Sequence, residues 1–98
     1  NDFVNVFDIA VRMYPNDEVA NLNAAAVALS KKDLPDARKY LDKSNKQTAE
    51  YANNNGIYYL LSGNQAQAIV EFTKAAQNGN EAARHNLGEI EKAIKTKK

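Results

Sequence analysis

The sequence contains no cysteine, and it has only one histidine among its 98 residues. The missing cysteines exclude disulfide bonds, cysteine-ligated zinc and thiol chemistry, and they leave the redox compartment open. No run approaches the roughly 18 consecutive apolar residues of a membrane span. No charged-then-apolar leader opens the chain, and it starts at Asn1 without methionine, so we expect a fragment or a processed product.

What is present is the composition of an ordinary folded chain, 44% hydrophobic and 26% charged, with room for one domain. The net charge is +1, but four of the 13 basic residues are lysines within positions 92–98. Residues 1–91 therefore carry nine basic and 12 acidic groups, a formal −3. A nucleic-acid groove would place basic residues along one face. The pattern instead indicates a weakly acidic body with a solubilising lysine tail, and it argues against nucleic acid as a partner.

The chain repeats itself with a period of 31 to 32 residues. A shift of 31 places Ala37 on Ala68 and Leu41 on Phe72. A step of 32 then carries Asn54 onto Asn86. Self-similarity at a fixed period of this size is typical of stacked-repeat proteins, in which one supersecondary unit recurs and buries its apolar face on its neighbour. The repeat predicts a scaffold or a binding surface without naming the partner.

Every long segment predicts helix, because apolar residues recur at three- and four-residue steps and no stretch alternates as a strand would. Asp33, Thr48 and Asn64 are predicted N-caps, and Gly63 a left-handed helix exit. We expect six helices in antiparallel neighbours. Four of them are residues 3–13, 18–31, 49–61 and 81 to about 94. The third in chain order is a short helix after Asp33, with Ala37, Tyr40, Leu41 and, as a candidate, Ser44 on its inner stripe. The fifth follows Asn64.

These features resemble tetratricopeptide repeats (TPRs), whose helix-turn-helix unit has an alanine at its twentieth position and an aromatic residue or leucine at its twenty-fourth. Units that start at residues 18 and 49 place Ala37 and Leu41, then Ala68 and Phe72, on those positions. The resemblance implies an all-α, antiparallel helix-hairpin solenoid in a single domain. Its parts are the second helix of a partial repeat (1–17), two repeats (18–48 and 49–80), and a terminal helix with a basic tail (81–98).

The sequence also departs from the family pattern. The units are shorter than the usual ~34 residues, and Asn55 occupies a position that is usually leucine. We expect the backbones of neighbouring helices to approach most closely at small residues, namely Ala37, Gly56, Gly63 and Ala68. An ordinary helical bundle with accidental similarity is the rival reading.

A second, narrower resemblance concerns location. The stretches "PNDEVANLNAAAVAL" and "ANNNGIYYLLSGNQAQAIV" are similar to the helical tail of Gram-negative outer-membrane-associated proteins that carry an OmpA-like domain. That likeness implies a periplasmic or outer-membrane-associated location and an accessory role in envelope assembly or anchoring. The cytoplasm remains the alternative.

The TPR resemblance also implies a ligand groove, lined by the first helix of each unit. Carried over by register, its residues are Leu22, Asn23, Ala26, Glu50, Asn53, Asn54, Ile57, His85, Asn86 and Glu89. Asparagine recurs at the sixth position as Asn23, Asn54 and Asn86. Because an amide both donates and accepts, such a row would grip the backbone of an extended peptide. The alternative is that these amides bond to neighbouring helices or to water.

The residues offer little for catalysis, and we expect no cofactor. His85 with Glu81 and Glu89 makes one helical face that would hold a metal weakly, but such a trio is more often a solvated charge pattern. Gly63 and Gly79 stand at helix exits rather than in a phosphate-binding loop. Three classes stay open: a non-catalytic module that binds a protein or peptide, a structural spacer that self-associates through the ends of the solenoid, and an accessory domain of an enzyme.

Overall fold

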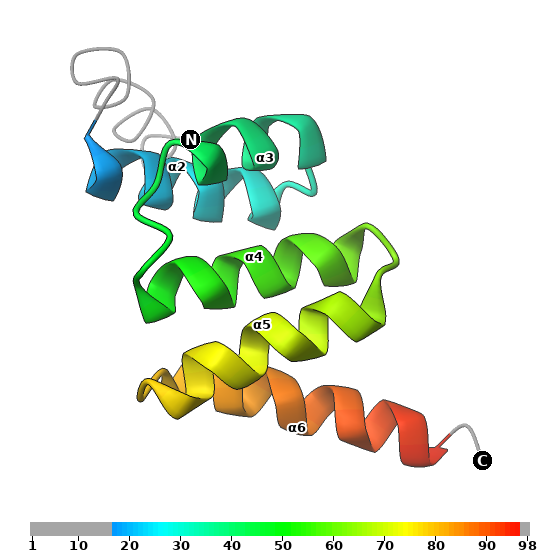
Figure 1. The fold of residues 1–98 in the computed structure, drawn as a ribbon. Helices are drawn as coiled ribbons and strands as arrows, with labels where there is room; N and C mark the ends of the chain where they lie inside the picture. The colour runs from blue at the N-terminus through cyan, green and yellow to red at the C-terminus, as the bar shows by residue number, and fades with distance from the viewer. Residues whose placement is uncertain (1–16, 97–98) are drawn as a thin grey trace.

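A computed structural model describes residues 17–96 as five α-helices joined by short loops (Figure 1). In chain order the helices are α2 (Glu18–Ser30), α3 (Leu34–Asp42), α4 (Ala49–Leu61), α5 (Gln65–Gln77) and α6 (Glu81–Thr96). No strand occurs within residues 17–96, which confirms the all-α class. The helix expected at residues 3–13 lies outside the described residues, so the expected total of six is not shown.

Each described helix begins where a short polar side chain caps its free N–H groups. Thr48 accepts a hydrogen bond from the backbone N–H of Tyr51 at 3.1 Å, and Asn64 accepts one from Gln67 at 3.1 Å. Such a cap satisfies one of the first-turn donors that have no partner inside the helix. The remaining helices are capped in the same way by Asp17, Asp33 and Asn80. The three caps predicted from the sequence, Asp33, Thr48 and Asn64, are confirmed.

Three helices end in a residue with left-handed backbone geometry. Gly63 and Gly79 have φ of 89° and 90°, as expected of glycines at helix exits. Lys32, after α2, also has a positive φ, of 60°. This left-handed residue was not predicted, because lysine adopts that region only at a steric cost. The backbone N–H of Lys32 donates to Leu29 and that of Asp33 donates to Ala28, so the α2 terminus is closed by hydrogen bonds despite the lysine.

The helices lie side by side in chain order, so that Figure 1 shows α2 and α3 at one end and α6 at the other. Contacts join α2 to α3, α4 to α5 and α5 to α6, and α4 also packs against both α2 and α3. The extents are 48 × 26 × 19 Å, so the molecule is elongated. The first helices of the two hairpins, α2 and α4, are in contact with each other.

The core at the α4–α5 contact is built around Phe72, which is fully buried. A Cβ atom added to Gly56 would lie only 2.6 Å from the Phe72 ring. Glycine is therefore required on α4, because any larger residue would overlap the aromatic side chain. Ala52, Ala68, Ala75, Ala83 and Ile90 complete this cluster. Phe72 therefore packs between the two helices of its own hairpin and α6.

Two details of the prediction are wrong. Gly63 does not lie where helix backbones meet, because nothing stands within 4 Å of the position of a Cβ there; its role is confined to the helix exit. Ser44 is not part of α3, which ends at Asp42, although the residue is buried and its hydroxyl donates to the carbonyl of Tyr40. The last helix ends at Thr96, close to the expected end at about residue 94.

Candidate functional site

The residues of the predicted groove lie on α2, α4 and α6. Their exposure divides them into two groups. Exposed to solvent are Asn23, Ala26, Glu50, His85 and Glu89, whereas Leu22, Asn54, Ile57 and Asn86 are half-buried and Asn53 is buried. The half-buried apolar members are attached to the core, since Leu22 packs against the cluster around Leu41 and Ile57 against that around Phe72. The exposed members of the row are therefore mostly polar, and its apolar members Leu22 and Ile57 pack against the core.

A side-chain hydrogen bond ties two members of this row together. Asn86 Nδ2 on α6 donates to Asn53 Oδ1 on α4 at 3.0 Å, although the two residues are 33 positions apart. The bond orients both amides and joins α4 to α6.

The other two recurring asparagines are differently placed. Within residues 17–96 the side-chain amides of Asn23 and Asn54 make no hydrogen bond to the protein. Asn23 is exposed and Asn54 half-buried. Their donors and acceptors are available to a bound segment, whereas the amide of Asn86 is already engaged with α4.

The α6 end of the row carries charge. His85 Nε2 lies 3.9 Å from Glu89 Oε1, and Lys92 Nζ lies 3.7 Å from the same oxygen. All three side chains are more than half exposed. Among the described residues no three acidic or histidine side chains converge as a metal site would require. The cluster is a solvated set of alternating charges on one helical face.

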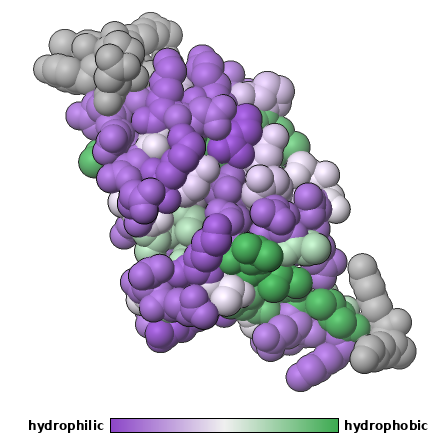
Figure 2. Space-filling model, viewed as in Figure 1, coloured by the Kyte–Doolittle hydropathy of each residue, from purple (hydrophilic) through white to green (hydrophobic). Residues whose placement is uncertain are grey.

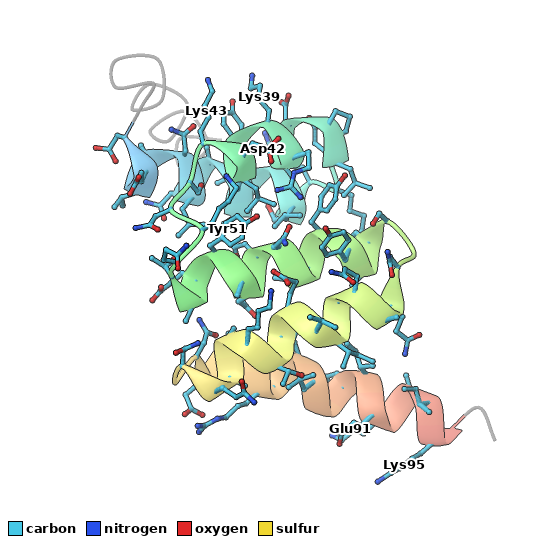
Figure 3. The ribbon with its side chains drawn as sticks, viewed as in Figure 1. Lys39, Asp42, Lys43, Tyr51, Glu91 and Lys95 are labelled. Atoms are coloured by element: carbon cyan, nitrogen blue, oxygen red, sulfur yellow. The ribbon has the colours of Figure 1, made fainter. Side chains whose placement is uncertain are left out.

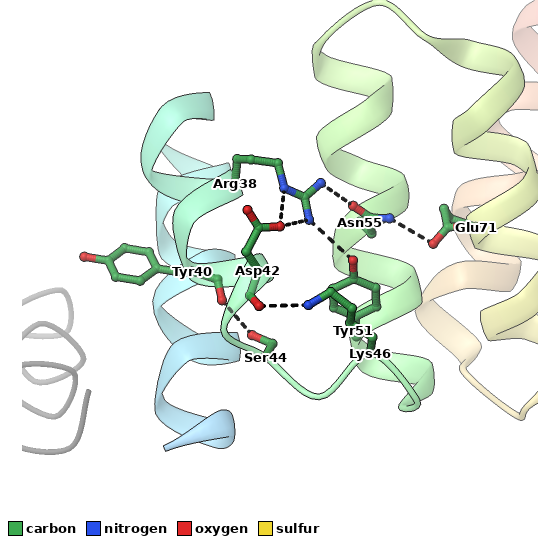
Figure 4. A network of polar contacts seen from close by, with 8 residues as sticks. All are labelled: Arg38, Tyr40, Asp42, Ser44, Lys46, Tyr51, Asn55 and Glu71. Carbon is green, nitrogen blue, oxygen red and sulfur yellow. Dashed lines mark hydrogen bonds and ion pairs between the residues drawn. The ribbon is translucent and has the colours of Figure 1, made fainter. Parts of the chain in front are cut away.

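A polar network that the sequence did not predict crosses from α3 to α5 through α4 (Figure 4). Arg38 Nη1 donates to Asn55 Oδ1 at 3.0 Å, and Asn55 Nδ2 donates to Glu71 Oε1 at 2.9 Å. Lys74 Nζ donates to the second oxygen of Glu71 at 2.9 Å. Glu71 is only 5% exposed, so its carboxylate depends on these two partners in place of water. The network therefore fixes the relative positions of three helices.

Arg38 anchors the α3 end of this network. It reaches Asp42 Oδ1 through Nε at 3.0 Å and Tyr51 Oη through Nη2 at 3.4 Å, and its guanidinium lies 5.0 Å from the centre of the Tyr58 ring. Burial lowers the pKa of Arg38, but the hydrogen bond to Tyr51 and the charge of Asp42 outweigh this, so the pKa is raised overall. These contacts therefore favour the charged form of Arg38.

The other end of the network is Lys74, whose pKa is raised above the ordinary lysine value by its hydrogen bond to Glu71 and by the charge of that carboxylate. The one signal in the sequence for this network is Asn55, an amide where the repeat pattern expects leucine. A buried amide needs partners. The sequence did not identify them, because Arg38 and Glu71 lie 17 and 16 residues away on different helices.

Comparisons with protein families, with curated proteins and with solved structures returned no match to this chain. No helix within residues 17–96 has the length and apolar character needed to cross a bilayer.

Proposed function

We propose that this chain is a non-catalytic, TPR-like interaction module that binds an extended protein or peptide segment along α2, α4 and α6. The proposal rests first on the resemblance of the sequence to TPRs, in which the corresponding helix faces line a concave groove. It is supported by the packing of α2 beside α4 and by the exposure of the polar row that these helices carry. We further propose that the module is part of a larger envelope-associated protein, periplasmic or at the outer membrane.

The observation that carries the proposal is the hydrogen bond between Asn53 and Asn86. Because this bond joins α4 to α6, the free amide of Asn54 and the side chains of His85 and Glu89 are held on neighbouring helices. A preformed polar surface of this kind binds with little ordering cost. Backbone amides of an extended segment would pair with Asn23 and Asn54, whose side chains offer one acceptor and two donors each.

The experiment starts from a phage-displayed peptide library selected against the 98-residue chain. Affinities of the selected peptides are then measured by calorimetry for the parent and for Asn54→Ala. We expect the variant to bind roughly tenfold more weakly, since about two hydrogen bonds are lost. Its melting temperature should not change, because the Asn54 amide makes no hydrogen bond within the described chain. Gln77→Ala, which removes an exposed amide from α5, is the matched control and should bind as the parent does.

Asn86→Ala separates a structural amide from a binding one. This change leaves the buried oxygen of Asn53 without its donor, which costs about 1–3 kcal/mol of the free energy of unfolding. We therefore expect Asn86→Ala to lower the melting temperature and Asn54→Ala to lower only affinity. A library that yields no binder, or peptides that bind Asn54→Ala as tightly as the parent, would contradict the proposed groove.

A further inference from the structure

Two glycines occupy equivalent positions in the repeat but have different surroundings. Gly56 on α4 is required by the fold, because a Cβ there would lie 2.6 Å from the Phe72 ring. Gly88, which is 32 residues later on α6, has nothing within 4 Å of its Cβ position. A glycine inside a helix costs stability relative to alanine. Nothing in the described chain requires this one, and glycine is also the residue that lets a second helix approach closely.

The face of α6 around Gly88 is a charged stripe. Residues at three- and four-residue steps share one face of a helix, and here they are Glu81, Arg84, Gly88, Glu91 and Lys95. The four charged side chains are exposed, and Figure 3 shows Glu91 and Lys95 projecting from the side of α6 that faces away from α5. On α4 the equivalent face, with Ala49, Ala52 and Tyr59, is apolar and packs in the core with α5. The α6 stripe is therefore not built to receive another helix like α5.

Along this stripe, residues at similar distances before and after Gly88 carry opposite charges. Glu81 and Lys95 each lie seven residues from Gly88, on opposite sides. Arg84 precedes Gly88 by four residues and Glu91 follows it by three. A helix with this pattern is complementary to an antiparallel copy of itself. If two such helices cross at Gly88, Glu81 of one meets Lys95 of the other and Arg84 meets Glu91, and the two-fold axis produces each pair twice.

An apolar edge runs beside the charged stripe. Leu87 and Ile94 flank it on α6, and Ile94 is 40% exposed. On the neighbouring α5, Val70 is 44% exposed. Figure 2 shows hydrophobic side chains gathered over α5 and the C-terminal half of α6, next to purple polar regions. In an antiparallel helix pair equivalent edges meet, so with Gly88 opposite Gly88 the Leu87 side chains of the two copies would lie beside each other, and Ile94 would lie against the N-terminal half of the second copy's α6.

From the open glycine, the charge order and this apolar edge, we propose that the chain forms a symmetric dimer through antiparallel packing of α6 against α6 of a second copy, centred on Gly88. Exposed ion pairs contribute little affinity individually. Apolar burial therefore drives association, and the charges set the direction and the register. An interface of one helix and its neighbour is small, which corresponds to a Kd in the range of roughly 1–100 µM. The surface shares no residue with the proposed groove, so the two proposals stand or fall separately.

Charge reversal with rescue tests the register. Sedimentation equilibrium of the 98-residue chain gives the dimer Kd for the parent, for Lys95→Glu and for the double variant Glu81→Lys/Lys95→Glu. Lys95→Glu places like charges opposite each other at both ends of the interface, so we expect Kd to rise about tenfold or more. The double variant restores opposite charges across copies, although it removes the exposed ion pair between Glu81 and Arg84 within each copy, and its Kd should return to within about threefold of the parent. Lys39→Glu, the same charge change on α3, is the matched control and should leave Kd unchanged.

Gly88→Ala gives a second, independent readout. The added methyl group enters open space in the single chain, so the melting temperature measured below the dimer Kd should rise with helix propensity. At the crossing point the same methyl group separates the helices, and the dimer Kd should rise as well. The dimer is overturned by a chain that stays monomeric up to about 1 mM, by unaltered Kd in both Lys95→Glu and Gly88→Ala, or by a double variant as weak as Lys95→Glu.

Discussion

The two helix hairpins, α2–α3 and α4–α5, share one register but fill their central contact with different residues. In the first, Ala25 on α2 packs with Leu41 on α3, and both are fully buried. In the second, 31 residues later, Gly56 receives the ring of Phe72. The larger side chain is matched by the loss of a methyl group on the facing helix. The combined volume of the two contacting side chains is therefore similar in both hairpins, although neither residue is the same.

The polar residues next to these contacts also differ. Ala24 and Tyr40 of the first hairpin correspond, after the shift of 31, to Asn55 and Glu71 of the second. Asn55 and Glu71 are buried and bonded to each other, and they connect outward to Arg38 and Lys74. The second hairpin is thus tied to its neighbours by hydrogen bonds, whereas the first uses apolar packing at the same positions. We expect the α4–α5 hairpin to be the more sensitive of the two to substitution.

The largest effect is expected for Phe72→Ala. Truncating a fully buried phenylalanine removes its burial energy and leaves a cavity beside Gly56, at a cost of about 3–5 kcal/mol. That figure is comparable to the whole stability of a small domain, so much of the chain should unfold near room temperature. Leu41→Ala in the first hairpin is the matched change and should cost less, about 2–4 kcal/mol. Urea denaturation followed by circular dichroism measures both. A Phe72→Ala variant that melts within a few degrees of the parent would place the ring at the surface.

Asn55→Ala should be the next most costly change. It removes one of the three acceptors of Arg38 and one of the two donors of the buried Glu71 carboxylate. Hydrogen bonds to charged groups contribute about 1.5–3 kcal/mol each, and we expect a loss in that range. Ala24→Ser is the control, a polar change at the equivalent buried position of the first hairpin. It breaks no hydrogen-bond network. If Asn55→Ala unfolds at the same urea concentration as the parent, the network is not holding the helices together.

Gly56→Ala should be destabilising even though alanine is the better helix former. The new methyl group would overlap the Phe72 ring at 2.6 Å, and overpacking costs about 1–3 kcal/mol. Gly88→Ala is the natural control, because the same change in open space should stabilise the isolated chain by about 0.5–1 kcal/mol. Thermal denaturation of dilute samples shows whether each variant is more or less stable than the parent. Equal and favourable shifts would show that Phe72 does not occupy the space beside Gly56.

The smallest effect concerns pH. The pKa of Lys74 is raised by its bond to Glu71, so folding favours the charged form of this lysine. The resulting stability is complete below the ordinary lysine pKa of 10.5 and is lost as pH rises through the higher pKa of the folded chain. Because the lysine side chain is 60% exposed, the effect should be small and should shrink with added salt. Lys74→Met should flatten this alkaline decline. An unchanged pH profile would contradict the assignment.

The sequence was sufficient to predict the helices that have clear signals at both ends. The helix at 49–61 was predicted with its observed bounds, because Thr48 caps it and Gly63 follows it. Lys32 was missed as a left-handed residue, since lysine carries no signal for that geometry. Gly56 and Gly63 were both assigned a packing role, and only Gly56 has one, because from the sequence alone a glycine at a helix exit and one at a contact look alike.

The candidate site was predictable only as a set of positions on three helices. Register placed Asn53 and Asn86 on the same face, but it did not show that one donates to the other. That bond depends on how closely α4 and α6 approach, which is set by the packing of α5 between them around Phe72. The chain from Arg38 to Lys74 was missed for the same reason, because its members come from three helices whose separation the sequence does not specify.

The direct contact between Gly56 and the Phe72 ring is the central feature of the second hairpin. A double-mutant cycle on these two residues tests it. The double variant Gly56→Ala/Phe72→Leu gives the second hairpin the alanine and leucine found at the equivalent positions of the first, Ala25 and Leu41. The free energy of unfolding is measured by urea denaturation for the parent, both single variants and the double. We predict that the double variant loses at least about 1 kcal/mol less than the two single losses combined, as expected for residues in direct contact. Additive losses would contradict the account, because they would show that the two positions do not share one contact.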